Sequence, residues 1–394
     1  MDPVLNPYAP GAGAPPPELA GRDQLLRKTS IALQRIASGR FGRSMILTGL
    51  RGVGKTVLLN RMRQEAEAVG LIAVRLEASE GRSLPSLLVP GLKSAILKLN
   101  RGKAAADFVT RGLRSLAGFV SVMKLKYHDI EVSLDLEPDE HFPTTANLDD
   151  SLSHLFQCVA MAAKEKKTAI VLFIDELQML DEKELSSLIS AFHVAAQDLL
   201  PITMVAAALP QIASKMGEAK TYAERLFEFP YIGQLDRGSA IRALGIPAEK
   251  LGVTYTDTAL DAILQNTEGY AYFLQEWGKH AWDCATTSPI TEEDAKIATV
   301  HALADLDASF FRMRFDQLTV MQKHYLRAMA ELDQEPCPSG KIATIMNKKV
   351  TALGTIREQL IKKGLIYSPS HGETAFTVPL FGAFMKRMMH VFNI

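Results

Sequence analysis

The stretch GLRGVGKTVLL, residues 49–59, decides how this sequence is interpreted, because it sets three glycines and a lysine between two apolar segments. The run SMILTGL before it has the composition of a buried strand, and KTVLLNRMRQEAEAVG has apolar residues at helical spacing. Residues 49–56 match G-x-x-x-x-G-K-[ST] in the strand–loop–helix context that this pattern requires. We call these residues the phosphate loop: Gly49, Leu50, Arg51, Gly52, Val53, Gly54, Lys55 and Thr56.

The residues of this loop have the chemistry needed to bind a nucleoside triphosphate. Glycines let successive backbone N–H groups turn inward around a phosphate, and the following helix adds the positive end of its dipole. Lys55 supplies a mobile positive charge for the outer phosphates, and the Thr56 hydroxyl is a ligand for Mg²⁺. The sequence therefore predicts that ATP and Mg²⁺ bind here, rather than that the match is an ordinary glycine turn.

A second apolar run, IVLFIDE at residues 170–176, ends in two acidic residues. Parallel sheets bind ligands at the carboxyl ends of their strands, so Asp175 is expected at the same edge as the phosphate loop. We expect Asp175 to hold Mg²⁺ through water and Glu176 to act as general base on the attacking water. Without the loop, two acids after a strand would indicate only a solvated strand end.

The order of strand-like and helix-like segments predicts an α/β fold with a parallel sheet. We expect four regions: an extended Pro/Gly/Ala-rich arm (1–19), a nucleotide-binding core (20–236), a helical region (237–312) and a C-terminal region (313–394). In the core, residues 83–100 are expected to be helical with a kink or break at Pro90. Residues 119–138 alternate enough to suggest a small hairpin.

Composition excludes several classes of protein. Hydrophobic residues make up 47% and charged residues 22%, an ordinary globular mixture, and the apolar runs are too short to cross a bilayer. The N-terminus lacks the features of a secretory signal, and three distant cysteines fit a reducing compartment, so we expect a cytoplasmic protein without membrane contact. The net charge is zero, but residues 336–394 carry eight basic and two acidic side chains, a net +6.

These segments together resemble the AAA+ ATPases, in particular the origin-recognition-like branch and its relatives in bacterial signalling. The matching pieces are ELAGRDQLL, GLRGVGKT, VLFIDELQ, AAALP, AKTYAERLFEF and TEGYAYFLQEWG. The resemblance implies a P-loop NTPase core with a helical lid and a C-terminal winged helix-turn-helix. It also implies an oligomer that assembles with nucleotide. Gly21 and Arg22 fall in the family's adenine-side motif, although Arg22 equally suits a contact that pins the N-terminal arm.

Arg225 matches the arginine that, in this family, reaches the γ-phosphate bound by the neighbouring subunit. The alternative is an ion pair within its helix or with the lid. Two positions depart from the family pattern: alanines fill the strand that often carries a polar sensor, with Thr203 near its beginning, and Tyr272 stands where many relatives place a sensing arginine. The departures predict slow hydrolysis, with nucleotide acting more as a switch than as fuel.

The C-terminal region has three helix-like pieces and a hairpin at the spacing of a winged helix. Its recognition-helix candidate carries residues that could contact double-stranded DNA: Lys348, Lys349, Thr351, Thr355 and Arg357. The alternative is a solvated or protein-docking module. The sequence thus favours an ATP-dependent DNA-binding ATPase, and leaves open a nucleotide-gated signalling or defence switch with a protein effector. A small-molecule kinase is disfavoured, because no arginine-rich substrate lid follows the core.

Overall fold

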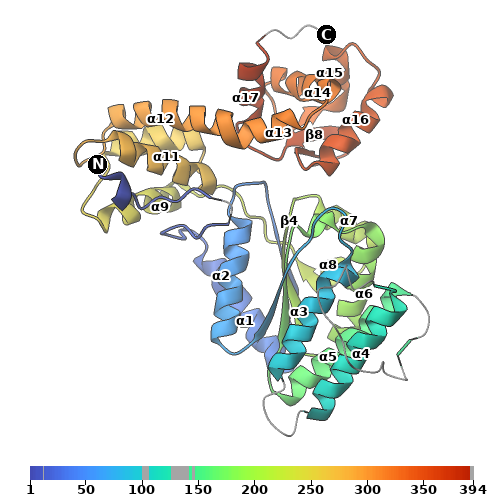
Figure 1. Ribbon diagram of the computed structural model, residues 1–394. Helices are drawn as coiled ribbons and strands as arrows, with labels where there is room; N and C mark the ends of the chain where they lie inside the picture. The colour runs from blue at the N-terminus through green and yellow to red at the C-terminus, as the bar shows by residue number, and fades with distance from the viewer. Residues whose placement is uncertain (12, 100–105, 126–141, 144–146, 391–394) are drawn as a thin grey trace. The chain divides into compact units, whose positions relative to one another are not determined.

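The computed structural model describes residues 1–11, 13–99, 106–125, 142–143 and 147–390 (Figure 1). The chain divides into two compact units. The sheet unit comprises Arg22–Thr48 and Lys55–Tyr231, and the helical unit comprises Met1–Gly21, Gly49–Gly54 and Ile232–Ile394. Over the described residues, no helix has both the length and the apolar character needed to cross a membrane.

The sheet unit is built on five parallel strands in the order β2-β3-β4-β1-β5. Their bounds are β1 Ser44–Thr48, β2 Ile72–Glu77, β3 Ile170–Asp175, β4 Ile202–Ala208 and β5 Phe227–Glu228. Every residue of β1 and β4 is buried, as is all of β3 except its last residue, Asp175. The predicted α/β class with a parallel sheet is confirmed, and the polar end of β3 lies at the carboxyl edge of the sheet.

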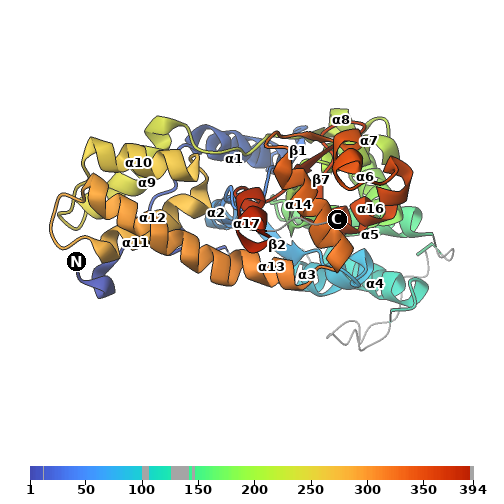
Figure 2. The ribbon, with the colours of Figure 1, turned by 90° about the horizontal axis from the view of Figure 1, so that it is seen from above.

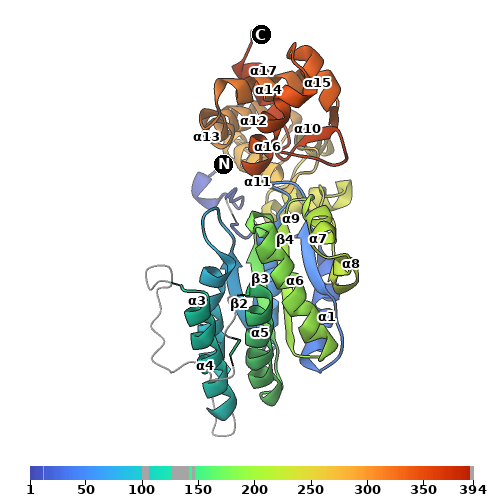
Figure 3. The ribbon, with the colours of Figure 1, turned by 90° about the vertical axis from the view of Figure 1, so that its right-hand side faces the viewer.

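Helices cover both faces of this sheet (Figures 1 and 3). One face carries α1 Asp23–Ala37 and α2 Lys55–Ala68; the other carries α3 Leu84–Leu99, α4 Ala106–Val122, α5 Leu148–Glu165 and α6 Glu182–Gln197. Two short helices, α7 Ile212–Ala219 and α8 Ala223–Leu226, follow β4. The start of α6 is fixed by a capping box, in which the Asp181 and Glu184 side chains bond to each other's backbone N–H groups.

Helix α3 forms as expected and runs through Pro90 without being divided there, with its apolar side buried in the core next to β2. One expectation for this unit needs correction. Residues 119–122, expected to begin a hairpin, form the last turn of α4. Leu116 and Phe119 are fully buried there at helical spacing, and Gly118 lies against the Phe142 ring, so packing selects the helix over the alternating pattern. Residues 126–138 of that expectation lie outside the described residues.

The helical unit begins with four helices that pack side by side (Figure 2). They are α9 Arg237–Glu249, α10 Asp257–Thr267, α11 Ala271–Cys284 and α12 Glu292–Leu306. The N-terminal arm, with the short 3₁₀ turn η1 Pro3–Leu5, is fastened to them. The Tyr8 hydroxyl donates to the carbonyl of Leu244 and accepts from Tyr255, and the Trp282 indole donates to the carbonyl of Asp2. The arm is therefore part of the packed structure, as Tyr8 is 5% exposed.

The C-terminal part of this unit is helical with a small antiparallel sheet. A π-helical turn, η4 Asp307–Phe311, and α13 Arg312–Asp316 lead into α14 Val320–Glu331, α15 Ser339–Ile345, α16 Val350–Lys362 and α17 Phe381–Met388. The strands β6 Cys337–Pro338, β7 Ile366–Tyr367 and β8 Glu373–Phe376 pair in the order β6-β8-β7. The hairpin expected in the C-terminal region is present as the antiparallel pair of β7 with β8. Gly364, with φ +66°, ends the turn after α16 in the left-handed conformation.

Candidate nucleotide-binding site

Thr56 and Asp175, the two predicted magnesium ligands, are brought together within the sheet unit. Thr56 is the second residue of α2 and Asp175 is the last residue of β3. The Thr56 Oγ1 donates a hydrogen bond of 2.7 Å to Oδ2 of Asp175. Both side chains are half-buried at the carboxyl edge of the parallel sheet. The two motifs, separated by 119 positions in the sequence, therefore converge on one point.

The donor set at this point suits magnesium. Mg²⁺ takes oxygen ligands, and it is held in proteins through one or two side-chain oxygens together with water and substrate phosphates. A hydroxyl and a carboxylate oxygen 2.7 Å apart supply such a pair. The other oxygen of Asp175 accepts the backbone N–H of Glu176 at 2.9 Å, which fixes the orientation of the carboxylate. The residues thus fit the ion that the sequence analysis predicted.

Glu176, the predicted general base, has an unusual backbone. Its φ of 53° and ψ of 39° are in the left-handed region, which is uncommon for a residue with a β-carbon. Such conformations cost of order 1 kcal/mol and persist where the surrounding structure enforces them, often at functional sites. Glu176 lies between the last residue of β3 and the turn η3, Leu177–Met179, and its side chain is half-buried. The left-handed backbone of Glu176 therefore lies at the junction of β3 and η3, directly after the predicted magnesium ligand Asp175.

Gln178 is a residue of this site that the sequence analysis missed. Its side chain is 8% exposed, and its Nε2 donates to Oε2 of Glu176. Its Oε1 accepts the backbone N–H of Leu209, immediately after β4, at 3.0 Å. The amide thus connects the predicted general base to the end of the neighbouring strand. A buried glutamine two positions after paired acids was the available signal, because a buried amide needs partners on both its sides.

The phosphate loop has the backbone that its glycines predicted. Gly52 and Gly54 have φ values of +85° and +92°, which L-residues rarely adopt. A β-carbon on Gly49 would lie 2.2 Å from the carbonyl oxygen of Ile232, so this position requires glycine. Residues 49–54 pack within the helical unit, where the carbonyl of Gly52 accepts the backbone N–H of Tyr272 at 3.0 Å.

Arg51 makes the loop's contact with the C-terminal part of the helical unit. Its backbone N–H donates to the carbonyl of Thr377 at 3.0 Å, and its Nε donates to the carbonyl of Gly364 at 3.2 Å. A β-carbon on Gly364 would lie 2.7 Å from the guanidinium, so the approach is close. The loop motif indicates no partner for Arg51, whereas the structure links this residue to the segments that precede β7 and follow β8.

The remaining core predictions concern Arg225, Thr203 and the adenine-side pair. Arg225, in α8, is exposed, and no ion pair of its guanidinium is found within the described parts of the chain. Thr203 is 2% exposed and its hydroxyl bonds to that of Ser44 at 2.9 Å, so it is enclosed in the sheet. Gly21, with φ +72°, lies against Ser239 in the helical unit, whereas Arg22 precedes α1 in the sheet unit. Their role in adenine binding stays a prediction.

The predicted DNA contacts divide into two groups. Exposed side chains occur at the start and on the outer side of α16, at Lys348, Lys349, Thr351 and Thr355. The guanidinium of Arg357 instead donates three hydrogen bonds to the β7–β8 segment. Its partners are the hydroxyls of Thr374 (2.9 Å) and Ser368 (2.7 Å) and the carbonyl of Glu373 (2.9 Å). Arg357 thus fastens α16 to the small sheet.

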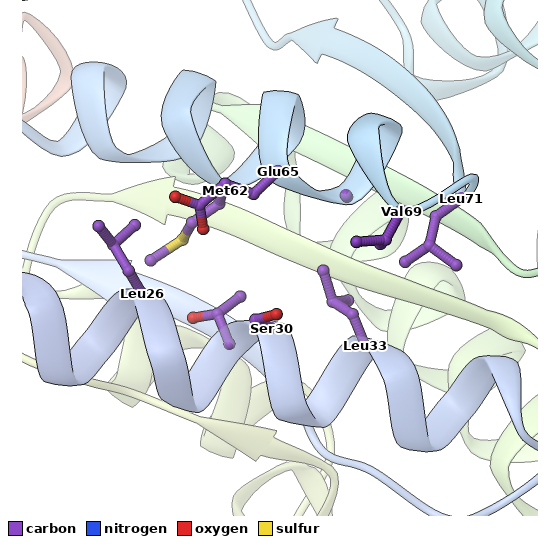
Figure 4. A pocket seen from close by; sticks show the side chains of 9 residues that line it. Leu26, Ser30, Leu33, Met62, Glu65, Val69 and Leu71 are labelled. Carbon is purple, nitrogen blue, oxygen red and sulfur yellow. The ribbon is translucent and has the colours of Figure 1, made fainter.

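A shallow cleft on the sheet unit lies between α1 and α2 (Figure 4). It is lined by Leu26, Thr29, Ser30, Leu33, Met62, Glu65, Ala66, Val69 and Leu71. The lining is mostly apolar and contains none of the predicted nucleotide or metal ligands. The cleft therefore shares no residue with the site at Thr56 and Asp175.

Comparison with known proteins gives two family matches and several similar solved structures. Residues 18–205 match the family described as AAA ATPase domain, and residues 308–385 match a domain of unknown function (DUF8462). No curated protein matches the chain significantly. A Walker-type ATPase of Pyrococcus abyssi has a similar solved structure, with a TM-score of 0.59, 14% identity, and coverage of 93% of this chain and 96% of that one.

Two further solved structures were found at lower similarity. The Orc1 protein of Aeropyrum pernix in complex with DNA gives a TM-score of 0.48 at 13% identity, covering 94% of this chain and 93% of that one. The RuvB Holliday junction branch migration motor of Thermotoga maritima gives 0.43 at 14% identity, covering 99% of each chain. The family match and the five-stranded parallel sheet with flanking helices establish the fold of a P-loop AAA+ NTPase.

Proposed function

We propose that this protein binds ATP with Mg²⁺ and hydrolyses it to ADP and phosphate. The proposal starts from the match of residues 18–205 to the AAA ATPase domain. The observation that carries the proposal is the hydrogen bond between Thr56 and Asp175, which joins the end of the phosphate loop to the acidic end of β3. We take residues 20–236 as the core, 237–312 as the lid and 313–394 as a winged-helix domain.

Each residue of the site has a defined task in this reaction. The backbone amides of residues 52–56 and the Lys55 ammonium bind the β- and γ-phosphates, while Thr56 and Asp175 are the magnesium ligands. When bound, Mg²⁺ neutralises charge that develops on the phosphate oxygens. Glu176 accepts a proton from the water that attacks the γ-phosphorus. Gln178 orients the Glu176 carboxylate by the hydrogen bond to Oε2, and is itself held by Leu209.

Arg225 is proposed to act on the nucleotide of a neighbouring subunit in a homo-oligomer that assembles with ATP. Its exposure and its freedom from ion pairs within the described residues support this role, because an arginine that acts in trans must be available at the surface. Hydrolysis is proposed to be slow. Thr203 is bonded to Ser44 inside the sheet, and Tyr272 carries no positive charge, so neither supplies a sensor for the γ-phosphate.

The C-terminal region is proposed to bind double-stranded DNA through the exposed residues of α16. Lys348 and Lys349 precede the helix, and Thr351 and Thr355 lie on its exposed side. The net charge of +6 over residues 336–394 favours phosphate contacts, which give modest sequence selectivity and a strong dependence on salt. Arg357 would support this surface indirectly, because its three hydrogen bonds fix α16 on the β7–β8 segment.

A second candidate function, a nucleotide-gated switch with a protein effector, is favoured by one observation. Arg51 of the phosphate loop bonds to Gly364 and Thr377, on either side of the β7–β8 strands. Rearrangement of the loop around a bound phosphate would change these two hydrogen bonds. Nucleotide binding would thereby control how firmly the C-terminal region is held. In this alternative the same exposed surface of α16 docks a protein.

One experiment separates the two candidates. Phosphate release and particle size are measured with ATP, ADP and duplex DNA in all combinations, for the wild type and for a Lys348→Ala/Lys349→Ala variant. The DNA proposal predicts binding that weakens steeply with salt and is reduced in the variant. If DNA binding is absent even at low salt while ATP turnover is intact, the nucleotide-gated switch is the remaining candidate. Turnover absent under every condition would contradict the ATPase itself.

A further inference from the structure

Three ionisable side chains converge between two helices of the helical unit. Glu276 and His280 are one turn apart on α11, and Asp305 lies near the end of α12, which packs along α11. The His280 Nε2 is 3.6 Å from Oε1 of Glu276 and 3.2 Å from Oδ2 of Asp305. One ligand atom from each residue lies within 4.8 Å of the other two.

The imidazole nitrogen at the centre of this group is buried and lacks a hydrogen bond. His280 is 9% exposed, and its Nε2 has no hydrogen-bond partner within the described residues despite its two carboxylate neighbours. A protonated imidazole paired with a carboxylate would direct its N–H at an oxygen in a short charge-assisted bond. Because neither contact has hydrogen-bond geometry, an ordinary ion pair accounts poorly for this arrangement. A buried polar atom without a partner requires another explanation, for which a bound ion is suited.

The spacing of the three atoms matches that of ligands around a small transition-metal ion. Imidazole and carboxylate ligands lie about 2.0–2.2 Å from Zn²⁺ in tetrahedral sites, so neighbouring ligand atoms are about 3.4 Å apart. The two distances from His280 Nε2, 3.2 and 3.6 Å, lie on either side of that value. One nitrogen and two carboxylate oxygens also leave one tetrahedral position open to water. The donor set is that of a first-row divalent metal rather than of calcium, which favours oxygen ligands alone.

Tyr272 supports the group from a second direction. Its hydroxyl hydrogen-bonds to the Glu276 side chain, one turn later on α11. Metal-binding carboxylates are commonly oriented by such outer contacts. The ring stacks on Phe310, with centroids 5.0 Å apart, which fixes its position.

We propose that Glu276, His280 and Asp305 form a binding site for a divalent transition metal, with zinc as the best match to the ligands. The ion would join α11 to α12 and stabilise the four-helix part of the helical unit. The site would also be connected to the phosphate loop, because the backbone N–H of Tyr272 donates to the carbonyl of Gly52. Metal binding here requires neither nucleotide nor turnover.

The test uses the full-length protein, freed of metal by a chelator and kept without nucleotide. Zn²⁺ is titrated in a calorimeter, and Co²⁺ is titrated separately while visible absorption is recorded. We expect one site per chain whose cobalt complex shows d–d bands without a thiolate charge-transfer band. His280→Ala should weaken the affinity by more than about 100-fold, and Tyr272→Phe by roughly 10- to 100-fold, because Tyr272 acts through Glu276.

Two variants serve as matched controls. Glu293→Gln changes an exposed acid on the same helix as Asp305, and His371→Ala removes an exposed imidazole near β8; both should bind metal as the wild type does. If His280→Ala does not fold, Asp305→Asn decides, because Asp305 is exposed and its amide preserves the shape. The proposal is overturned if the wild type binds neither metal, or if folded Asp305→Asn binds Zn²⁺ with unchanged affinity.

Discussion

The hydroxyl of Thr56 and the carboxylate of Asp175 share a hydrogen bond of 2.7 Å at the carboxyl edge of the parallel sheet. Thr56 is held in place by the first turn of α2, and Asp175 by pairing of β3 with strands on both sides. Two rigid elements therefore present their oxygens to one point. Such preorganisation lets a magnesium–nucleotide complex bind without the cost of ordering the ligands.

Replacement of Glu176 with glutamine should uncouple ATP binding from hydrolysis. The amide keeps the shape of the side chain but accepts no proton from the attacking water, so we expect turnover to fall by about 100-fold or more. Affinity for ATP should remain, and particles formed with ATP should become larger. Phosphate release and light scattering measure the two effects. Glu182→Gln, in the first turn of α6, is the control with the same charge change. Unchanged turnover would remove Glu176 from the reaction.

Loss of the Gln178 side chain should affect both stability and turnover. Gln178→Ala leaves the backbone N–H of Leu209 buried without its partner, which costs about 1–3 kcal/mol of unfolding free energy. It also frees the Glu176 carboxylate, so we expect the rate constant for turnover to fall while the affinity for ATP is kept. Urea unfolding and steady-state kinetics measure the two effects. A variant that loses stability but keeps its full turnover rate would limit Gln178 to a structural role.

The contrast between Gln178 and the phosphate loop shows what the sequence could predict. The loop is contiguous, and its glycines, lysine and threonine have roles that follow from their spacing. Asp175 was predictable because a buried parallel strand must end at the ligand edge. The partners of Gln178 depend on where β4 ends relative to β3, which is a matter of register rather than of local pattern.

Other features were hidden for similar reasons. Arg51 is one of the variable positions of the loop motif, so its bonds to Gly364 and Thr377 could not be read from the motif. Phe119 fits both a helical and an alternating pattern, and burial in α4 selects between them. The sequence predicts that Thr203 lies near the beginning of its strand, and the structure agrees. Its hydrogen bond to the hydroxyl of Ser44, inside the sheet, depends on strand pairing and could not be predicted.

Two inactive variants should restore activity to each other if Arg225 acts in trans. Arg225→Ala should reduce turnover by about 1,000-fold where the arginine is needed for the transition state. In a mixture with Glu176→Gln, some interfaces pair an intact Glu176 with an intact Arg225. When the two variants are mixed in equal amounts, about one quarter of the head-to-tail interfaces contain an intact Glu176 facing an intact Arg225. Substantial activity should therefore return.

The control for that mixture is Lys215→Ala, which removes a charge from an exposed position on α7 and should leave turnover unchanged. Phosphate release from the mixture is compared with the mean of the two separate variants. A mixture no more active than that mean would assign Arg225 to its own subunit or to a structural contact.

Cys337 should make the protein less stable at alkaline pH. Burial, reinforced by Glu335, raises the pKa of its thiol from 9.0 to about 11. Between these values the unfolded chain loses a proton that the folded chain keeps, so this contribution to stability is constant below pH 9 and declines as pH rises towards 11. The loss is of order 2 kcal/mol.

Urea unfolding at pH 8 and pH 10.5 measures this decline. Cys337→Ala should reduce the difference between the two pH values, whereas Cys158→Ala, at a half-buried position on α5, should leave it unchanged. An equal decline in the wild type and in Cys337→Ala would mean that the thiol contributes nothing to it.

The most direct test is calorimetric titration of ATP into the wild type, Thr56→Val and Thr56→Ser, each with Mg²⁺ and with a chelator. The wild type and Thr56→Ser should bind ATP at least about tenfold more tightly with Mg²⁺, because each keeps the hydroxyl beside Asp175. Thr56→Val should lose that increment and keep its magnesium-free affinity. Absence of ATP binding by the wild type, or an equal magnesium effect in Thr56→Val, would contradict the shared site of Thr56 and Asp175.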